Sequence, residues 1–324
     1  MRFVKLRSLA KINLDLRILH QRSDGFHELR TVFQTISLSD SIEIEYEKSR
    51  RTELTIEGSV DIPDNLVLRA ARAFLDAARI HARIHFRLNK KIPMGAGLGG
   101  GSSNAAAVLL ALPVLSGRAV AVDRIAADLG SDVPFFLQGG TAVAIGRGTE
   151  SYGLPDLIQE PILIAASGVH VSTGPAYQAL GRGLTFTQSS SSIRSFQEFV
   201  CALGRKRRAT LACALSRNDF EAVVLKQYPK LKTILGKLSK SGAAGARMTG
   251  SGSAVFALYR SGLERERALT KLTRDRSFSG CEVTPASLIG RRAYQRLWRD
   301  QLREHLDPDE ACDELWPPRS RYAR

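Results

Sequence analysis

The sequence contains no uninterrupted apolar run of about 18 residues, the minimum for a helix that crosses a membrane. Its first residues, Met1–Arg7, alternate charged and apolar side chains, which is unlike the apolar core of a secretion signal. We therefore expect a cytoplasmic protein with no membrane association. Cysteine is also scarce, at four residues in 324, and no C-x-x-C pair occurs. This excludes a disulfide framework and a cysteine zinc site, and it fits a reducing compartment.

Tryptophan and methionine are rare, yet the composition is that of a globular protein, with 44% hydrophobic and 24% charged residues. The length suits one large domain or two ordinary ones. The formal net charge of +15 has three explanations, which we rank as dispersed surface charge, an anionic small-molecule ligand and nucleic acid. One basic cluster occupies residues 205–208. No zinc-finger, helix-turn-helix or RNA-binding aromatic pattern is present, so no nucleic-acid partner is expected.

Hydrophobic periodicity predicts a mixture of strands and helices without regular β-α-β alternation, which favours the α+β class. The expected strands are residues 10–18, 29–37, 41–47, 52–57, 82–88, 161–166 and 254–258. The expected helices are residues 66–80, 104–112, 122–129, 195–203 and 220–240, with a loop at 187–192. A change of composition near residue 155 predicts an N-terminal domain at 1–155 and a C-terminal domain at 156–295. The charged stretch 291–324 is expected to be a helix followed by a tail, either packed or disordered. Residues 296–324 of it form a C-terminal extension beyond the two domains.

The strongest local signal is a glycine-rich segment, Pro93–Ser103, between an expected strand and an expected helix. Glycines let backbone N–H groups converge on an anion, and a following helix adds the partial positive charge of its N-terminus. The segment is not a P-loop, because Gly101 stands where the lysine belongs. It matches the dinucleotide fingerprint at Gly95, Gly97 and Gly100, but Lys90–Pro93 separate it from the strand, and no acidic residue follows at a strand end. A polyphosphate-binding loop is the interpretation that remains.

This segment resembles the phosphate loop of the GHMP small-molecule kinases. Three further segments strengthen the resemblance, and their order and spacing fit that family up to about residue 295: Ala10–Leu14 with Arg22–His27, Gly130–Phe136, and Met248–Ser253. The resemblance implies two domains, the N-terminal one like the second domain of ribosomal protein S5 and the C-terminal one ferredoxin-like. It also implies an ATP-dependent kinase, with the two substrates meeting between the domains, and a monomer or homodimer.

The resemblance implies roles for particular residues. Asp132 would accept the proton of the substrate hydroxyl, and Lys11 would keep that carboxylate ionised. ATP would contact the following residues of the loop and its borders: Asn65, Lys90, Pro93, Met94, Gly95, Ala96, Gly97, Leu98, Gly99, Gly100, Gly101, Ser102 and Ser103. Magnesium is implied by phosphoryl transfer, and its ligands are unknown. From the residues alone, Asp132 reads equally as a helix N-cap and Lys11 as a surface residue of a strand.

The acceptor implied by the resemblance is an alcohol that carries a cytidine diphosphate group and is phosphorylated on its 2-hydroxyl. Phe26 and Tyr177 would flank the cytosine ring, His27 would hydrogen-bond its edge, and Asn13 would also line the substrate site. Core packing is the competing explanation for the two aromatic residues. Another small alcohol, such as homoserine, mevalonate or a sugar, is the alternative acceptor. A basic nucleic-acid-binding protein and a nicotinamide oxidoreductase are the alternatives from other classes.

Overall fold

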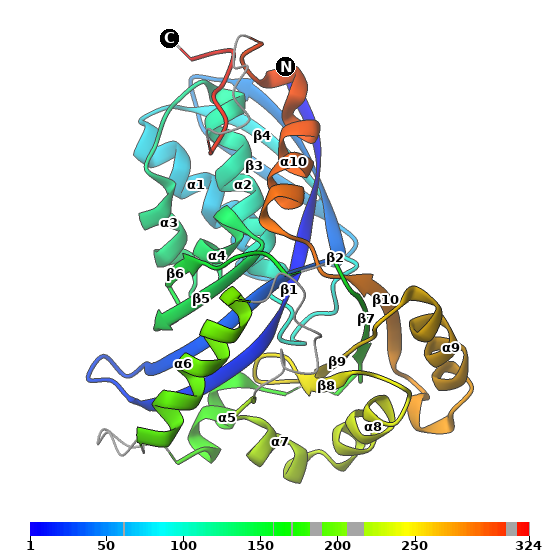
Figure 1. Ribbon diagram of the computed structural model, residues 1–324. Helices are drawn as coiled ribbons and strands as arrows, with labels where there is room; N and C mark the ends of the chain where they lie inside the picture. The colour runs from blue at the N-terminus through cyan, green and yellow to red at the C-terminus, as the bar shows by residue number, and fades with distance from the viewer. Residues whose placement is uncertain are drawn as a thin grey trace.

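The computed structural model describes residues 1–60, 62–157, 159–169, 171–181, 190–205, 217–308 and 316–323. Two layered units, each built on a sheet, are joined by one long antiparallel hairpin (Figure 1). Strand β1 (Arg2–Gln21) and strand β2 (His27–Lys48) form this hairpin, which reaches from the N-terminal unit down to the C-terminal unit. Most of the predicted basic cluster, residues 206–208, lies outside the described residues.

The N-terminal sheet is organised around β2, whose two halves pair with different strands. The second half of β2 pairs with β4 (Ala82–Asn89), and the first half pairs with β5 (Thr141–Gly146). Strand β3 (Glu53–Gly58) joins β4 in parallel through helix α1 (Leu66–Ala78), and β6 (Glu150–Gly153) completes the sheet beside β5. Because β2 pairs with both β4 and β5, it brings together segments that are far apart along the chain.

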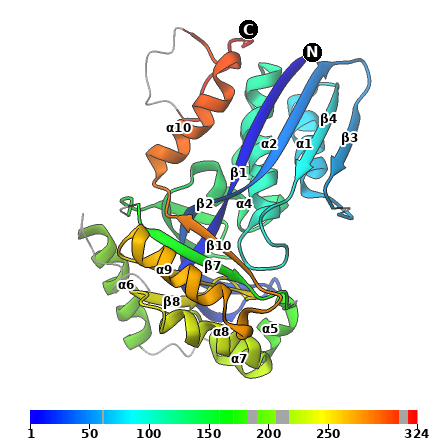
Figure 2. The ribbon, with the colours of Figure 1, turned by 90° about the vertical axis from the view of Figure 1, so that its right-hand side faces the viewer.

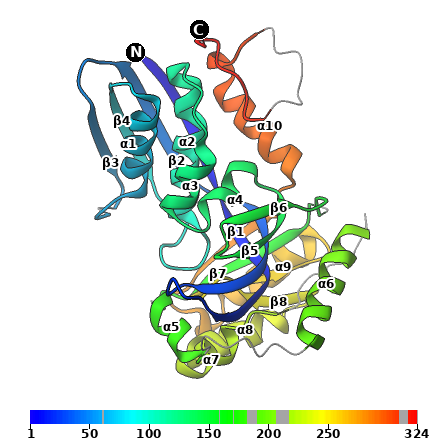
Figure 3. The same cartoon turned by 90° about the vertical axis from the view of Figure 1, so that its left-hand side faces the viewer.

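Four helices cover one face of this sheet (Figure 3). These are α1, α2 (Gly100–Ser116), α3 (Val122–Leu129) and α4 (Val133–Gln138). Helix α2 is the central one, and its side chains from Ser103 to Leu112 are all buried. The small and apolar side chains of α2 are therefore surrounded by the protein core. This packing fixes the orientation of the helix, and with it the direction of its N-terminus.

The C-terminal unit has a four-stranded antiparallel sheet in the order β10-β7-β9-β8 (Figure 2). Its strands are β7 (Pro161–Ala166), β8 (Gly245–Met248), β9 (Ala254–Leu258) and β10 (Glu282–Ser287). The helices are α5 (Thr173–Ala179), α6 (Ser190–Arg205), α7 (Glu221–Gln227), α8 (Pro229–Ser239) and α9 (Gly262–Thr273), followed by a 3-10 turn, Arg276–Phe278. None of the helices described has the length and apolar composition to span a bilayer.

The chain then returns to the N-terminal unit. Helix α10 (Arg291–Leu302), with a 3-10 turn at Arg303–His305, packs beside β1 (Figure 1) and buries Tyr294 and Trp298 in the N-terminal core. The Tyr294 ring lies where a Cβ on Gly139 would be, and its hydroxyl donates to the Phe136 carbonyl at 2.5 Å. The described end of the chain also packs, since Trp316 Nε1 donates to the Leu137 carbonyl at 2.6 Å. Helix α10 crosses the division predicted at residues 295 and 296.

The α+β class is confirmed, and several predicted elements agree with the structure within two residues. Others differ for identifiable reasons. Helix α2 begins at Gly100 rather than Asn104, because its first turn consists of two glycines and two serines, which are weak helix formers. The predicted helix 220–240 is divided at Tyr228–Pro229 into α7 and α8. The loop predicted at 187–192 is helical from Ser190, and residues 187–189 lie outside the described residues.

We expect Trp298→Ala to lower the free energy of unfolding by about 3–5 kcal/mol, because it removes a side chain that is 1% exposed in the N-terminal core. Chemical denaturation measures the effect. Arg296→Ala on the exposed face of the same helix is the matched control and should change stability little. Equal effects of the two substitutions would contradict the packing of α10 described here.

Candidate active site

The glycine-rich loop owes its path to an alternation of residue types. Gly95, Gly97 and Gly99 have φ values of 65°, 78° and 70°, a region that favours glycine. Ala96 and Leu98 between them are each 1% exposed and anchor the loop in a buried apolar cluster. Every second residue of the loop is therefore anchored in the protein interior, while Met94 is 57% exposed. The backbone of the loop is thus held in a defined conformation.

Helix α2 begins directly where this loop ends. The N–H groups of Gly100, Gly101 and Ser102 fall in its first turn and have no acceptor within the helix. Ser103 is committed to the interior instead, since its Oγ donates to the Leu9 carbonyl at 2.6 Å and its N–H to the Gly99 carbonyl at 2.9 Å. The loop end therefore offers backbone donors and the Ser102 hydroxyl to an anion.

A second glycine segment of the C-terminal unit lies against this loop. A Cβ added to Gly97 would be 2.3 Å from the Thr249 carbonyl oxygen, and one added to Gly250 would be 3.0 Å from the Gly97 Cα. The Ala254 N–H donates to the Ala96 carbonyl at 3.2 Å. The two glycine segments therefore meet backbone to backbone across the two units.

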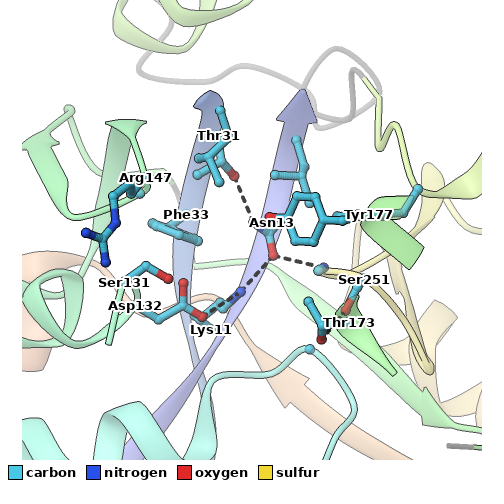
Figure 4. Close-up of a pocket in the computed structure, with 16 residues that line it drawn as sticks. Lys11, Asn13, Thr31, Phe33, Ser131, Asp132, Arg147, Thr173, Tyr177 and Ser251 are labelled. Carbon is cyan, nitrogen blue, oxygen red and sulfur yellow. Dashed lines mark hydrogen bonds and ion pairs between the residues drawn. The ribbon is translucent and has the colours of Figure 1, made fainter. Parts of the chain in front are cut away.

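A cavity of about 180 Å³ opens beside this contact, with residues of both units in its wall (Figure 4). Asn13 of β1 holds the wall together. Its Oδ1 accepts from Lys11 Nζ at 2.9 Å and from the Gly250 N–H at 3.0 Å, and its Nδ2 donates to Thr31 Oγ1 at 2.8 Å. One buried amide thus links β1, β2 and the second glycine segment.

Lys11 and Asp132 meet at the floor of the cavity. Lys11 Nζ lies 3.2 Å from Asp132 Oδ2, and the lysine side chain is 4% exposed whereas the aspartate is 28% exposed. Asp132 stands at the N-cap position of α4, but its side chain makes no capping hydrogen bond. The capping alternative is therefore not what the structure shows. A buried ammonium instead holds a carboxylate that remains open to the cavity, an arrangement suited to accepting a proton.

Aromatic residues gather at the other end of the cavity. Tyr177 of α5 lines it, stacks on His27 with ring centroids 4.5 Å apart, and packs edge-on against Phe220. Phe26, at the tip of the β1–β2 hairpin, is 52% exposed. The Arg147 guanidinium lies 3.8 Å from the centroid of the Phe26 ring. The structure therefore brings the three predicted aromatic residues to one region, through direct contacts with residues of the cavity wall.

Protonation states at this end follow from burial. Burial, with the Asp132 charge as a second cause, raises the pKa of Tyr177 to about 12, so its phenol is protonated at neutral pH. Burial and the nearby His20 lower the pKa of His27 below its ordinary value. His27 is therefore a neutral ring at neutral pH, able both to stack and to hydrogen-bond a neutral partner.

Two residues predicted to border a nucleotide have structural partners. Asn65 caps α1, its Oδ1 accepting from the Val67 N–H at 3.0 Å. The Lys90 ammonium forms an ion pair with Asp40, whose side chain is fully buried and also accepts from the Ile92 N–H at 2.8 Å. The ammonium is 3.1 Å from where a Cβ on Gly100 would lie, so it sits beneath the start of α2. Lys90 is a buried support of the loop and not a surface charge.

Sequence reasoning missed Arg147 and several other wall residues. Arg147 lies between β5 and β6, and its Nε is buried without a hydrogen-bond partner among the described residues. The flanking Gly146 and Gly148, both at positive φ, are the sequence signal that could have marked it as a turn residue. Other wall residues carry no local sequence signal and were found only from the fold: Leu16, Leu29, Thr31, Phe33, Thr173 and Phe220. Among the described residues, no group of three or more His, Cys, Asp or Glu could hold a metal ion.

A glycine-built anion loop that faces a lysine–carboxylate pair, in a cavity between two sheet-based units, defines a small-molecule phosphotransferase. Family models for the GHMP kinases match the chain, the N-terminal domain at residues 65–140 and the C-terminal domain at 199–276. The chain belongs to the GHMP kinase family. This confirms the expected family and two-domain fold.

Curated relatives and a solved structure refine this placement. The chain is 48% identical to 4-diphosphocytidyl-2-C-methyl-D-erythritol kinase of Solibacter usitatus, over 99% of this chain and 98% of the relative. It is 36% identical to the enzyme of that name from Geobacter metallireducens, over 84% and 95% of the two chains. A crystal structure of 4-(cytidine 5'-diphospho)-2C-methyl-D-erythritol kinase superimposes with a TM-score of 0.72 at 34% identity, covering 88% of this chain and 99% of the other.

We expect Gly97→Ala to destabilise the protein by at least about 2 kcal/mol, because it adds overlap with Thr249 to the penalty of a positive φ. Gly25→Ala is the matched control. Gly25 has a φ of 84° with nothing within 4 Å of an added Cβ, so this variant carries the φ penalty alone. Denaturant unfolding of both variants separates the two effects. Equal losses would contradict the close contact at Gly97.

Proposed function

We propose that this protein transfers the γ-phosphoryl group of ATP to the 2-hydroxyl of 4-diphosphocytidyl-2-C-methyl-D-erythritol, a step of isoprenoid precursor synthesis. The observation that carries the proposal is the Lys11–Asp132 pair, 3.2 Å apart, at the floor of a cavity that the glycine-rich loop also borders. The names of its curated relatives support the choice of substrate.

ATP would bind at the glycine-rich loop. The backbone N–H groups in the first turn of α2 would donate hydrogen bonds to its phosphates, and Pro93–Gly99 would border the nucleotide. Ala96, Leu98 and Ser103 support this surface from the protein interior. The positive charge of Lys90, which lies beneath Gly100, would attract the phosphates. Asn65 would contribute indirectly, because its side chain caps the start of α1.

The reaction requires an acceptor oxygen, a place for its proton and a leaving group. The substrate hydroxyl would give its proton to the Asp132 carboxylate while its oxygen bonds to the γ-phosphorus. The bond from that phosphorus to the bridging oxygen breaks, and ADP leaves with that electron pair. Lys11, which is held by Asn13, would orient the Asp132 carboxylate and offset negative charge that develops beside it.

Magnesium would shield the phosphate charges. The described residues contain no cluster of three or more metal-ligating side chains, which agrees with a Mg²⁺ ion bound mainly through the phosphates of the nucleotide. The Ser102 hydroxyl, in the first turn of α2, is a protein oxygen available to such an ion.

The acceptor would extend from Asp132 toward the aromatic end. The Arg147 guanidinium, with its unpaired buried Nε, would meet the diphosphate, and Phe26, His27 and Tyr177 would contact the cytosine. Homoserine, mevalonate or a sugar has no cytosine ring, so these acceptors would make no such contact at the aromatic end of the cavity. A phosphoryl-transfer assay with labelled ATP and all four acceptors tests the choice, as does thermal protection by cytidine diphosphate. Preference for another acceptor, with no protection, would refute the substrate assignment.

We expect Asp132→Asn to reduce kcat by roughly 10²- to 10⁴-fold, because an amide cannot accept the proton. Binding of ATP should change little, since the contacts of the loop remain. The control is Asp128→Asn on α3, which removes an exposed carboxylate outside the cavity wall. A folded Asp132→Asn variant with near-normal kcat would remove Asp132 from the mechanism.

We expect Arg147→Gln to raise KM for the cytidylated acceptor by about 10- to 100-fold through loss of a charge-assisted contact with the diphosphate, with KM for ATP unchanged. Arg147→Lys should recover part of the affinity. The control is Arg124→Gln, an exposed arginine on α3. Steady-state kinetics with each substrate varied separately distinguishes this role from general damage, which would alter both KM values.

A further inference from the structure

The two ends of the chain lie near each other at the top of the N-terminal unit (Figure 1). Residues near both ends line a second cavity, which shares no lining residue with the active-site cavity. Its volume is about 430 Å³, and its wall comes from four separate segments. Arg2 begins β1, Lys48 ends β2, Arg118 follows α2, and Arg321 belongs to the C-terminal tail. Nothing in the proposed kinase mechanism uses these residues.

The charged residues among those described in the wall of this cavity are all basic. The wall contains four cationic side chains, and no aspartate or glutamate is among its described residues. Within the described part of the chain, none of the four forms an ion pair with a carboxylate. By contrast, many other exposed basic residues are paired, such as Arg83 with Glu47 and Glu53. Like charges that gather in one place repel one another, so the described wall of the cavity favours an anion.

Part of this arrangement is held rigidly. The Arg2 guanidinium donates to the Leu115 carbonyl at the end of α2 and lies 3.4 Å from the centroid of the Tyr322 ring. Arg321 lies 5.9 Å from the same ring centroid and donates to the Glu304 carbonyl. Burial raises the pKa of Tyr46, and the charges of Arg2 and Arg118 oppose that rise.

We propose that this cavity is a binding site for a diphosphate group, separate from the kinase site. Several adjacent cations around a space of this size match a compact anion with several oxygens better than a single carboxylate. The diphosphate could be inorganic or carried by a small molecule. The lysine and the three arginines would contact its oxygens, and Tyr322 would close one side.

The test measures equilibrium binding of inorganic pyrophosphate and, in a second arm, methyl diphosphate, to the full-length protein without Mg²⁺. The test variant is Lys48→Gln/Arg118→Gln, which changes two exposed residues of the wall. The matched control is Lys240→Gln/Arg260→Gln, two exposed cations of the C-terminal unit, so both variants lose the same charge. Lys48→Arg/Arg118→Lys tests for rescue.

We expect wild type, control and rescue variants to show one class of sites that the test variant lacks or binds at least about tenfold more weakly. Kinase activity without pyrophosphate should be equal in all four proteins. Stronger binding of methyl diphosphate would indicate a ligand that carries the group, and equal or weaker binding would indicate the inorganic ion. Identical binding curves for test and control variants would overturn the proposal, since the pyrophosphate would then be bound only elsewhere.

Discussion

The contact between Gly97 and the Thr249–Gly250 turn is the constraint on which the active site depends. It joins the phosphate loop of one unit to a turn of the other with no side chain between them. Asn13 then binds to that turn through the Gly250 N–H, and Lys11 binds to Asn13. The orientation of the lysine is thus a consequence of how closely two glycine segments approach. A side chain at either position would widen the junction and shift the ammonium.

The buried ammonium of Lys11 is stable because its surroundings satisfy it. Burial of an unpaired charge is costly, and here the Asn13 oxygen, the Asp132 carboxylate and the face of the Phe33 ring lie around it. Asp132 differs in that part of it faces the cavity. The pair is therefore asymmetric, with one partner fixed in the protein and the other presented to a substrate. This asymmetry is what proton transfer requires, because the acceptor of the proton must be reachable.

Much of this arrangement was predictable from sequence, and the exceptions have physical causes. Strand β9 and helix α3 agree with the periodicity residue for residue, because each has one clear pattern. The loop was recognised from its glycines, but the inward direction of Ser103 depends on packing against Leu9. The buried ion pair of Lys90 could not be predicted from local sequence, because its partner, Asp40, is 50 residues away on β2. Arg147 has no local pattern beyond two glycines, and only the fold brings it to Phe26.

The proposed kinase site accounts for only part of the positive charge of the protein. From the sequence, dispersed surface charge ranks first and an anionic ligand second as explanations of the net charge of +15. Among the residues that line the active-site cavity, the basic ones are Lys11 and Arg147. Lys11 is already compensated by Asp132, so Arg147 is the cation in this wall without a carboxylate partner among the described residues. Four further basic residues line the cavity at the chain ends, with no carboxylate among the described lining residues. A polyphosphate in the active site would not reduce the repulsion among them, since screening at physiological salt acts over about 8 Å. Their clustering therefore calls for a counter-ion of its own.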